Sequence, residues 1–373
     1  MRGKIFALCL AAVCLTSCAK GAAPLHKNEH NENVSLNADY EYADVKDISD
    51  TRLSEEYGHL EFDFTPNLTL PDELYNFTLV QADDYYEYQS NICKLFLDDE
   101  NAALSTSNAN TENELRQCEL SNGGVLNLNR NGEVGFIRNN AAYEYRDESA
   151  YDKVVFLDTD YDDITIHQKN GDILLSELTR SVQEYMDDYS DITHASSQIP
   201  KRAYIASSGK YDVVLFSFTQ SIDGLGLATF NTRCAGNVSK AAEEWGTTIV
   251  IGTDGDVIFF SDLDGERKLK ENGDKITQII TPQSAISNLD EYLAANSEYS
   301  VCSFSLELLP LIESNPRQND EGFEWTVSAT NYGTVYSVEP YWSFVLRDNV
   351  SGDLFNAAIN AVSGEIFFGK EIQ

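Results

Sequence analysis

Short stretches in which apolar and polar residues alternate dominate the sequence beyond about residue 55. Residues 58–80 read GHLEFDFTPNLTLPDELYNFTLV, and a two-residue period of this kind is typical of half-buried β-strands. We expect further strands in segments 143–145, 154–157, 210–230, 247–262, 301–312 and 324–329, and three more between 340 and 368. Turn signals separate them at Asn122-Gly123-Gly124, Asn131-Gly132, Asp223-Gly224, Asp254-Gly255, Ser351-Gly352 and Ser363-Gly364.

Two segments have a helical period instead. The first, residues 172–189, is expected to begin with Asp172 as its cap. Its apolar positions fall on one face: Leu174, Leu178, Val182, Tyr185 and Tyr189. The second has Thr281 as a candidate N-cap, Pro282 at the first helical position and Asn296 as a terminator. Its apolar face is formed by Ile286, Leu289 and Leu293.

These patterns predict an α+β fold. Two helices are too few to serve as crossovers between parallel strands, so the sheets are expected to be antiparallel. We expect two lobes of antiparallel sheet, each with about one covering helix. The predicted boundaries are 56–265 for the N-terminal lobe and 266–373 for the C-terminal lobe.

The first eighteen residues have the pattern of an export signal. Arg2 and Lys4 precede an apolar run, Ile5 to Leu15, which is shorter than the roughly 20 residues of a membrane-spanning helix. The sequence Leu15-Thr16-Ser17-Cys18 then resembles the bacterial lipobox, in which a diacylglycerol is attached to the cysteine. We therefore expect residues 1–17 to be a lipoprotein signal peptide and Cys18 to become the lipidated first residue. The alternative is an ordinary signal peptide cleaved elsewhere.

A polar segment follows the predicted lipidation site. Residues 18–55 are rich in Asn, Glu, Asp and Lys, and such a composition buries too little apolar surface to become ordered. We expect a flexible acidic linker that holds the body at the extracytoplasmic face of the cell membrane through the N-terminal lipid.

The balance of charge limits the partners. The 373 residues include 26 basic and 61 acidic ones, for a net charge of -35. A field of this sign repels nucleic acid, so we expect no nucleic-acid partner.

Acidic clusters raise the question of calcium. An EF-hand loop starting at Asp158 would need Gly and Glu where Asp163 and Lys169 stand. Calcium therefore remains open only for an irregular loop there, or around Asp254, Asp256, Asp262 and Asp264. We assign no metal site and no other cofactor.

Four cysteines remain after the predicted cleavage, namely Cys93, Cys118, Cys234 and Cys302. Cys93 with Cys118 is the most local disulfide, and closing a loop of about 25 residues stabilises a protein by roughly 3 kcal/mol. Free buried thiols are the alternative. No CxxC spacing indicates a zinc site.

No catalytic motif is present. The sequence lacks GxSxG, HExxH and a phosphate-binding glycine loop. His59, His167 and His194 have no evident catalytic partner in the sequence, and with 61 acids no carboxylate pair stands out. We therefore expect a protein that is not an enzyme, with a hydrolase using unrecognised carboxylates as the weakest alternative.

The C-terminal part carries short motifs with a family resemblance. They are the segment 218–225, Tyr341-Trp342-Ser343-Phe344, and Asn360 to Ile366. In these motifs and their order, residues 172–368 resemble PepSY-type and YycH/YycI-like extracytoplasmic proteins. The resemblance implies a binding, inhibitory or sensor-modulating role outside the cell, with an envelope protein as partner. Physically, Trp342 is expected to pack in a core, and Gly224, Gly352 and Gly364 to occupy positive-φ turns.

Together these features predict a non-catalytic, lipid-anchored binding or regulatory module. A surface glycan binder is the alternative, because tyrosines alternate with acids in DDYYEYQ, residues 83–89, and AYEYRDESAYDK, residues 142–153. An exposed aromatic platform would favour the glycan binder, and an apolar groove would favour the regulatory module.

Overall fold

The computed structural model describes residues 40–48, 56–62, 68, 70–81, 85–107, 115–129, 132–145, 150–159, 161–228, 240–242, 246–262, 267–293, 297–313, 317–319, 322–324 and 336–370. The predicted signal peptide, the lipidation site Cys18 and Cys234 lie outside these residues. The predicted α+β class is confirmed, because antiparallel sheets dominate the described residues and few helices accompany them. Within this part of the chain, no helix combines the length and the apolar character needed to cross a membrane.

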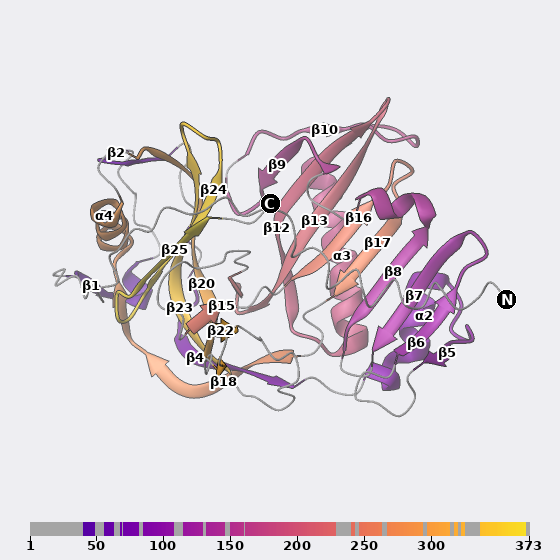
Figure 1. The fold of residues 1–373 in the computed structure, drawn as a ribbon, viewed down its shortest axis with the longest axis horizontal. Coiled ribbons are helices and arrows are strands. Elements are labelled where there is room, and N and C mark those ends of the chain that lie inside the picture. Colours follow the sequence, from indigo (N-terminus) through magenta and orange to yellow (C-terminus); the bar gives the residue numbers. More distant parts are fainter. Residues whose placement is uncertain are drawn as a thin grey trace. The chain divides into compact units, whose positions relative to one another are not determined.

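A 10-stranded sheet is built from the middle of the chain, in the order β5-β6-β7-β8-β17-β16-β13-β12-β9, with β14 paired to β13. Figure 1 shows these strands side by side. Their bounds are β5 (Ser105–Ser107), β6 (Leu115–Glu119), β7 (Gly123–Asn129), β8 (Val134–Asn139), β9 (Lys153–Phe156), β12 (Ser197–Ser208), β13 (Tyr211–Ile222), β14 (Leu225–Gly226), β16 (Thr247–Ile251) and β17 (Val257–Asp262).

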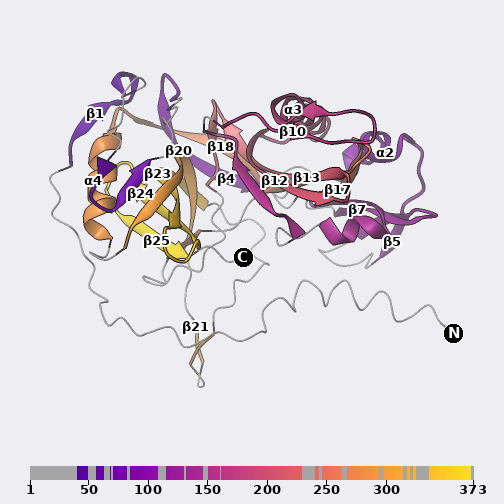
Figure 2. The same cartoon turned by 90° about the horizontal axis from the view of Figure 1, so that it is seen from above.

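Two helices, α2 (Gln89–Leu97) and α3 (Leu175–Thr193), cover the same face of this sheet (Figure 2). Along β13, Val214, Phe216 and Phe218 alternate toward that face and pack in one core with the helices. The buried side of α3 follows the helical period with Leu175, Leu178, Val182, Met186 and Tyr189. The predicted first helix is thus confirmed, whereas α2 was not predicted.

The cap of α3 differs from the prediction. Asp163, thirteen residues earlier, accepts hydrogen bonds from the backbone N–H of Ser176 at 3.1 Å and from its hydroxyl at 2.6 Å. The helix begins at Leu175, and Asp172 instead pairs with His167 at 3.0 Å. A carboxylate that is distant in sequence therefore satisfies the free N–H groups of the first turn.

A 9-stranded sheet contains strands from both ends of the described chain, in the order β18-β4-β23-β20-β3-β2, with β15 on β20, β24 on β23 and β25 on β24. Its strands are β2 (Glu56–Tyr57), β3 (Leu60–Phe62), β4 (Leu74–Gln81), β15 (Lys240–Ala242), β18 (Arg267–Ile276), β20 (Tyr299–Glu313), β23 (Tyr336–Asp348), β24 (Leu354–Asn360) and β25 (Ile366–Lys370). Strands β2 to β4 precede residue 265 but lie in this sheet together with strands that follow it. The division into sheets therefore differs from the predicted lobe boundary at residue 265, and that boundary stays a prediction.

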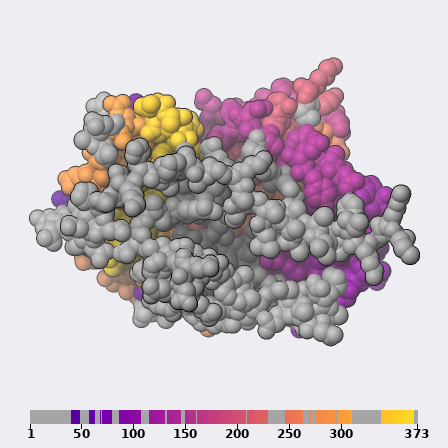
Figure 3. Space-filling view, in the orientation of Figure 1, coloured from indigo at the N-terminus to yellow at the C-terminus, as the bar shows by residue number. Residues whose placement is uncertain are grey.

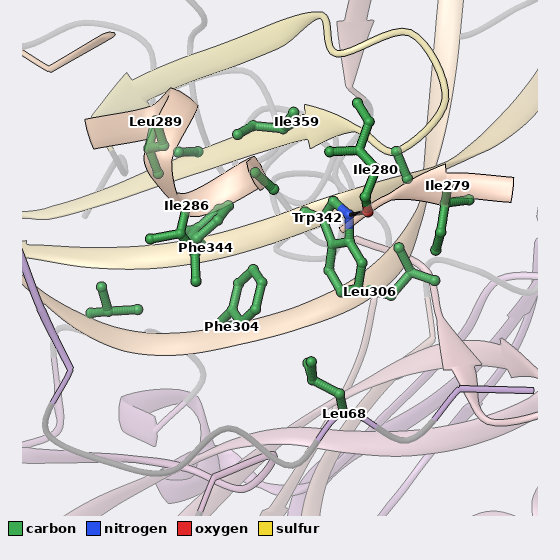
Figure 4. Close-up of a cluster of buried hydrophobic side chains, with 14 of the residues drawn as sticks. Leu68, Ile279, Ile280, Ile286, Leu289, Phe304, Leu306, Trp342, Phe344 and Ile359 are labelled. Carbon is green, nitrogen blue, oxygen red and sulfur yellow. Dashed lines mark hydrogen bonds between the residues drawn. The ribbon is translucent and has the colours of Figure 1, made fainter. Parts of the chain in front are cut away.

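The core of the 9-stranded sheet is centred on Trp342, which is fully buried as expected (Figure 4). Its ring stacks on Phe304 at 5.4 Å, and its indole N–H donates to the carbonyl oxygen of Ile280 at 2.8 Å. Helix α4 (Pro282–Tyr292) covers this core with Ile286 and Leu289. The Thr281 side chain accepts from the Ser284 N–H at 3.3 Å, so the predicted cap is confirmed. The helix ends at Tyr292, earlier than predicted.

Smaller elements complete the described fold. They are the pairs β1 (Tyr42–Asp44) with β19 (Gln278–Ile280), β10 (Thr165–Ile166) with β11 (Ile173–Leu174), and β21 (Arg317–Asn319) with β22 (Gly322–Glu324), and the 3-10 helices η1 (Val45–Asp47), η2 (Tyr85–Tyr88) and η3 (Asn140–Tyr145). The outer atoms of this body come from both halves of the sequence, as the colours in Figure 3 show.

Two predictions about these segments were wrong. The expected strand 143–145 belongs to η3, because the side chain of Asn139 accepts from the N–H groups of Ala141 and Ala142 and turns the chain there. The predicted flexible linker, 18–55, was too long. Within it, Val45 and Ile48 are buried in the core of the 9-stranded sheet, and burying these side chains helps to offset the entropy of ordering.

The terminal hairpin ties this N-terminal segment to the body. Gly364 turns the chain between β24 and β25 with a φ of 78°, as predicted, and its carbonyl accepts from the Tyr40 hydroxyl at 2.7 Å. A Cβ at Gly364 would lie 2.2 Å from the Tyr40 ring. Gly352, in the preceding turn, also has a positive φ of 76°, but a Cβ there meets nothing within 4 Å.

We therefore expect Gly364→Ala to lower the free energy of unfolding by about 2–3 kcal/mol, because it adds a clash with Tyr40 to the backbone strain. Gly352→Ala, the matched control, should cost only about 1 kcal/mol. Urea unfolding of both variants measures the difference. Equal losses would show that the Tyr40 contact does not contribute.

Candidate binding site

A cavity of about 510 Å³ is lined by residues of helices α2 and α3 and of the 10-stranded sheet that they cover. Its volume is in the range of cavities that hold small ligands. The lining comes from the end of α2, the β6–β7 turn region, β8, α3 and the β16–β17 turn: Leu95, Phe96, Leu97, Leu120, Asn122, Phe136, Arg138, Tyr185, Gly255, Asp256 and Val257.

Three aromatic residues, Phe96, Phe136 and Tyr185, form part of the wall, and Phe96 of α2 packs against the other two and against the buried Phe260. The Phe96 ring lies 5.2 Å from Phe136 of β8, 4.9 Å from Phe260 of β17 and 6.1 Å from Tyr185 of α3. Because these rings come from two helices and two strands that are packed in one core, the wall is preformed. Burial, followed by the charge of Asp188, raises the pKa of Tyr185. Its hydroxyl therefore stays protonated at neutral pH.

Two opposite charges lie at the cavity. Arg138 follows Phe136 by two residues on β8, so both point to the same face of the sheet. The Arg138 guanidinium lies 2.5 Å from the carboxylate of Asp256 in the β16–β17 turn, and the two side chains are 40% and 51% exposed. An ion pair of this exposure contributes little to stability. Breaking this ion pair therefore costs little free energy, so that Arg138 or Asp256 can pair with a charged group of a ligand instead.

Sequence reasoning found few of these residues. Asp256 was considered only as a calcium ligand, and Tyr185 only as part of a helix face. The end of α2 was missed, although Ile92 and Cys93 are buried and Phe96 follows at helical spacing. This spacing of apolar residues was the available signal for the helix. It was weak, because the cap position is occupied by Tyr88 and not by Ser, Thr, Asp or Asn.

The acidic residues considered for calcium have other contacts. Asp163 caps α3, and Asp262 is buried, accepting hydrogen bonds from Tyr189 at 2.5 Å and Thr247 at 3.1 Å. Asp264 lies outside the described residues. Among the residues that the structure describes, no group of three or more His, Cys, Asp or Glu side chains converges on one point.

Asp158 belongs to a buried ion cluster between the two sheets. Lys201 of β12 lies 3.4 Å from Asp158 and forms a closer ion pair with Glu307 of β20. The Ser303 hydroxyl, also on β20, donates to Asp158 at 2.7 Å. Burial opposes the charge on Lys201, but Glu307 and Asp158 outweigh this effect and raise the pKa of Lys201.

The three histidines of the body have contacts of a structural kind. The N–H of His59 donates to Asp290 at 2.5 Å, and His194 ends α3 with its ring 5.3 Å from Tyr88. The hydrogen bond to Asp172, and then its charge, raises the pKa of the exposed His167.

The predicted disulfide partners lie beside the cavity. Cys93 is buried on α2, and Cys118 is half-buried on β6. Both are free thiols in the structure. Whether Cys93 and Cys118 become oxidised stays a prediction.

Comparisons with known proteins give weak structural similarity alone. No protein-family model matches the sequence, and no curated protein matches it. Among solved structures, the chain is similar to the C-terminal domain of YpeB from Bacillus megaterium. The TM-score is 0.34 and the sequence identity 13%, over 78% of this chain and 100% of that chain. The finer resemblance to YycH/YycI-like proteins stays a prediction.

The ion cluster gives a prediction for stability. Glu307→Gln should lower the free energy of unfolding by about 2 kcal/mol, because it removes the closest counter-charge of the buried Lys201. The raised pKa of Lys201 means that this loss is fully present at pH values below the ordinary lysine value of about 10.4. It should fade as the pH rises through the raised value, where the folded protein also releases the proton.

Chemical denaturation at pH 7 measures this loss. Glu73→Gln is the matched control, since Glu73 pairs with Lys275 at 2.6 Å while both side chains are about half exposed. It should leave the unfolding midpoint unchanged. If both variants behave alike, the buried cluster is not what stabilises the contact between the sheets.

Proposed function

We propose that this chain is a non-catalytic, lipid-anchored binding module outside the cytoplasm, and that the cavity beside α2 is its binding site. The aromatic-lined cavity of about 510 Å³ with a charge pair at its edge is the observation that carries this proposal. A recess with apolar walls and a few charged groups favours a binding or regulatory module over a glycan platform.

The lining indicates the chemistry of the ligand. Leu97, Phe136 and Val257 offer an apolar surface, and Arg138 offers a guanidinium to a carboxylate once it leaves Asp256. The complementary ligand has an apolar or aromatic body and a carboxylate close to it. An apolar side chain next to an acidic group on an envelope protein fits this description, whereas the net charge of -35 disfavours nucleic acid.

The tyrosines that raised the glycan alternative are engaged in packing. The guanidinium of Arg116 lies 3.6 Å from the centre of the Tyr86 ring. The Tyr151 hydroxyl donates to the carbonyl of Tyr145 at 2.6 Å, and its ring lies 6.2 Å from Tyr204. These contacts account for the tyrosine-rich segments without a sugar, so the cavity supports the binding-module proposal better.

Binding of 4-phenylbutyrate and of its neutral analogue 4-phenylbutan-1-ol, followed by calorimetry or ligand-observed NMR, tests the site. We expect Arg138→Ala to weaken phenylbutyrate binding about tenfold and to change binding of the alcohol less than twofold, because one charge-assisted contact is lost. Val257→Trp, which fills the cavity, should abolish binding of both probes.

Arg347→Ala is the matched control, because Arg347 is exposed on β23 of the other sheet. Melting temperatures confirm that each variant is folded. Unchanged affinity in both Arg138→Ala and Val257→Trp, or no binding of either probe to the wild type, would reject the cavity as the binding site.

The anchor has a separate test. Cells that express the protein are fed an alkyne-labelled palmitate, and incorporation is read after immunoprecipitation. We expect labelling of the wild type and none of Cys18→Ala, because the thiol of Cys18 is the expected point of attachment. Cys14→Ala, altered within the predicted signal peptide, should retain the label; label on Cys18→Ala would refute the anchor.

A further inference from the structure

Helix α2 and strand β6 are held together at the start of the helix. The side-chain oxygen of Gln89, the first residue of α2, accepts a hydrogen bond from the Arg116 guanidinium of β6 at 2.5 Å. The same guanidinium lies over the ring of Tyr86, just before the helix, at 3.6 Å. Arg116 therefore fixes where α2 begins relative to β6.

The end of the helix and the end of the strand both lie at the cavity. Leu97, the last residue of α2, and Leu120, directly after β6, line the same cavity. Alternation along the strand puts Arg116 and Leu120 on one face of β6, with Cys118 between them on that face.

Cys93 occupies the corresponding middle position on α2. It follows Gln89 by four residues, about 6 Å along a helix axis, and Cys118 follows Arg116 by two residues, about 6.6 Å along a strand. Cys93 is only 1% exposed, and Cys118 packs against the same core cluster. Burial, and then the nearby thiol of Cys118, raises the pKa of Cys93. The Gln89–Arg116 contact, the shared core and this interaction all place the two thiols near each other.

We propose that Cys93 and Cys118 form a redox-controlled staple that fixes one wall of the cavity, a dithiol in the structure described and a disulfide after oxidation. This inference rests on the proposed function of the cavity. Leu95, Phe96 and Leu97 on α2 and Leu120 beside β6 are the wall residues that the staple would hold. A nine-residue helix has little stability of its own, so a covalent link to a strand limits its motion.

The oxidant is a disulfide, either a small molecule or the disulfide form of a thiol–disulfide oxidoreductase. The half-buried Cys118 reacts first: its thiolate attacks one sulfur of the oxidant and releases the other as a thiol. The Cys93 thiol then loses its proton, attacks the Cys118 sulfur of the mixed disulfide and releases the second thiol. One protein dithiol and one oxidant disulfide thus give one protein disulfide and two thiols.

The first experiment detects the disulfide directly and does not depend on ligand binding in the cavity. The full chain in detergent is treated with glutathione disulfide or with dithiothreitol, alkylated, digested and mapped by mass spectrometry. We expect a Cys93–Cys118 linked peptide after oxidation, with Cys302, on the other sheet, still alkylated as an internal control. The melting temperature should rise by about 5 °C on oxidation, and Cys118→Ser should remove both effects.

A stable glutathione adduct on Cys118 without the linked peptide, or pairing of either thiol with Cys234 or Cys302, would overturn the staple. The second experiment measures phenylbutyrate dissociation from the oxidised and the reduced protein. We expect at least a threefold slower dissociation after oxidation and no change in Cys118→Ser. Equal rates in the presence of the linked peptide would overturn the control of the cavity. If neither form binds the probe, the proposed function fails, while the peptide map still decides the staple.

Discussion

Each of the two large sheets has an apolar face that must be covered, and few helices are present in the described chain to cover it. Helix α4 suffices over the Trp342 core, and α3 covers the centre of the 10-stranded sheet. Helix α2 is short: it stops at Leu97, and Asp98 turns the chain with a φ of 55°. Beyond this point Leu97, Phe136 and Val257 line the cavity beside the end of the helix. The candidate site therefore lies where α2 ends.

Much of the fold could be predicted from the sequence because strand period and turn glycines act locally. The hairpin at Asp254-Gly255 and the Thr281 cap are such cases, and both occur as expected. The candidate site could be predicted far less well, because α2 lacks a capping residue and its apolar spacing is short. The segment 143–145 alternates like a strand, but the side chain of Asn139 decides for a 3-10 helix. In such cases contacts with residues outside a segment decide its secondary structure, and the pattern of apolar and polar residues within the segment does not.

The many acids of this chain show why neighbouring charges in a sequence do not define a site. Asp158 and Asp163 are five residues apart, yet one pairs with Lys201 between the sheets and the other caps α3. Asp256 directly precedes β17 and lies at the cavity, whereas Asp262 ends the same strand and lies in the core with Tyr189. Each carboxylate meets a different donor because the fold places it in different surroundings, which composition does not reveal.

The strand order of the 9-stranded sheet has a consequence for how the chain reaches its native state. Strand β3 runs parallel to β20, pairing residues 60–62 with 299–301, and β4 pairs with β18 and β23. During synthesis, β3 and β4 therefore leave the ribosome more than a hundred residues before these partners. The 10-stranded sheet is built from the intervening residues 105–262 and does not have to wait for the C-terminus. Contacts between residues so far apart in the sequence slow folding. We therefore expect the 9-stranded sheet to form late, after translation is complete.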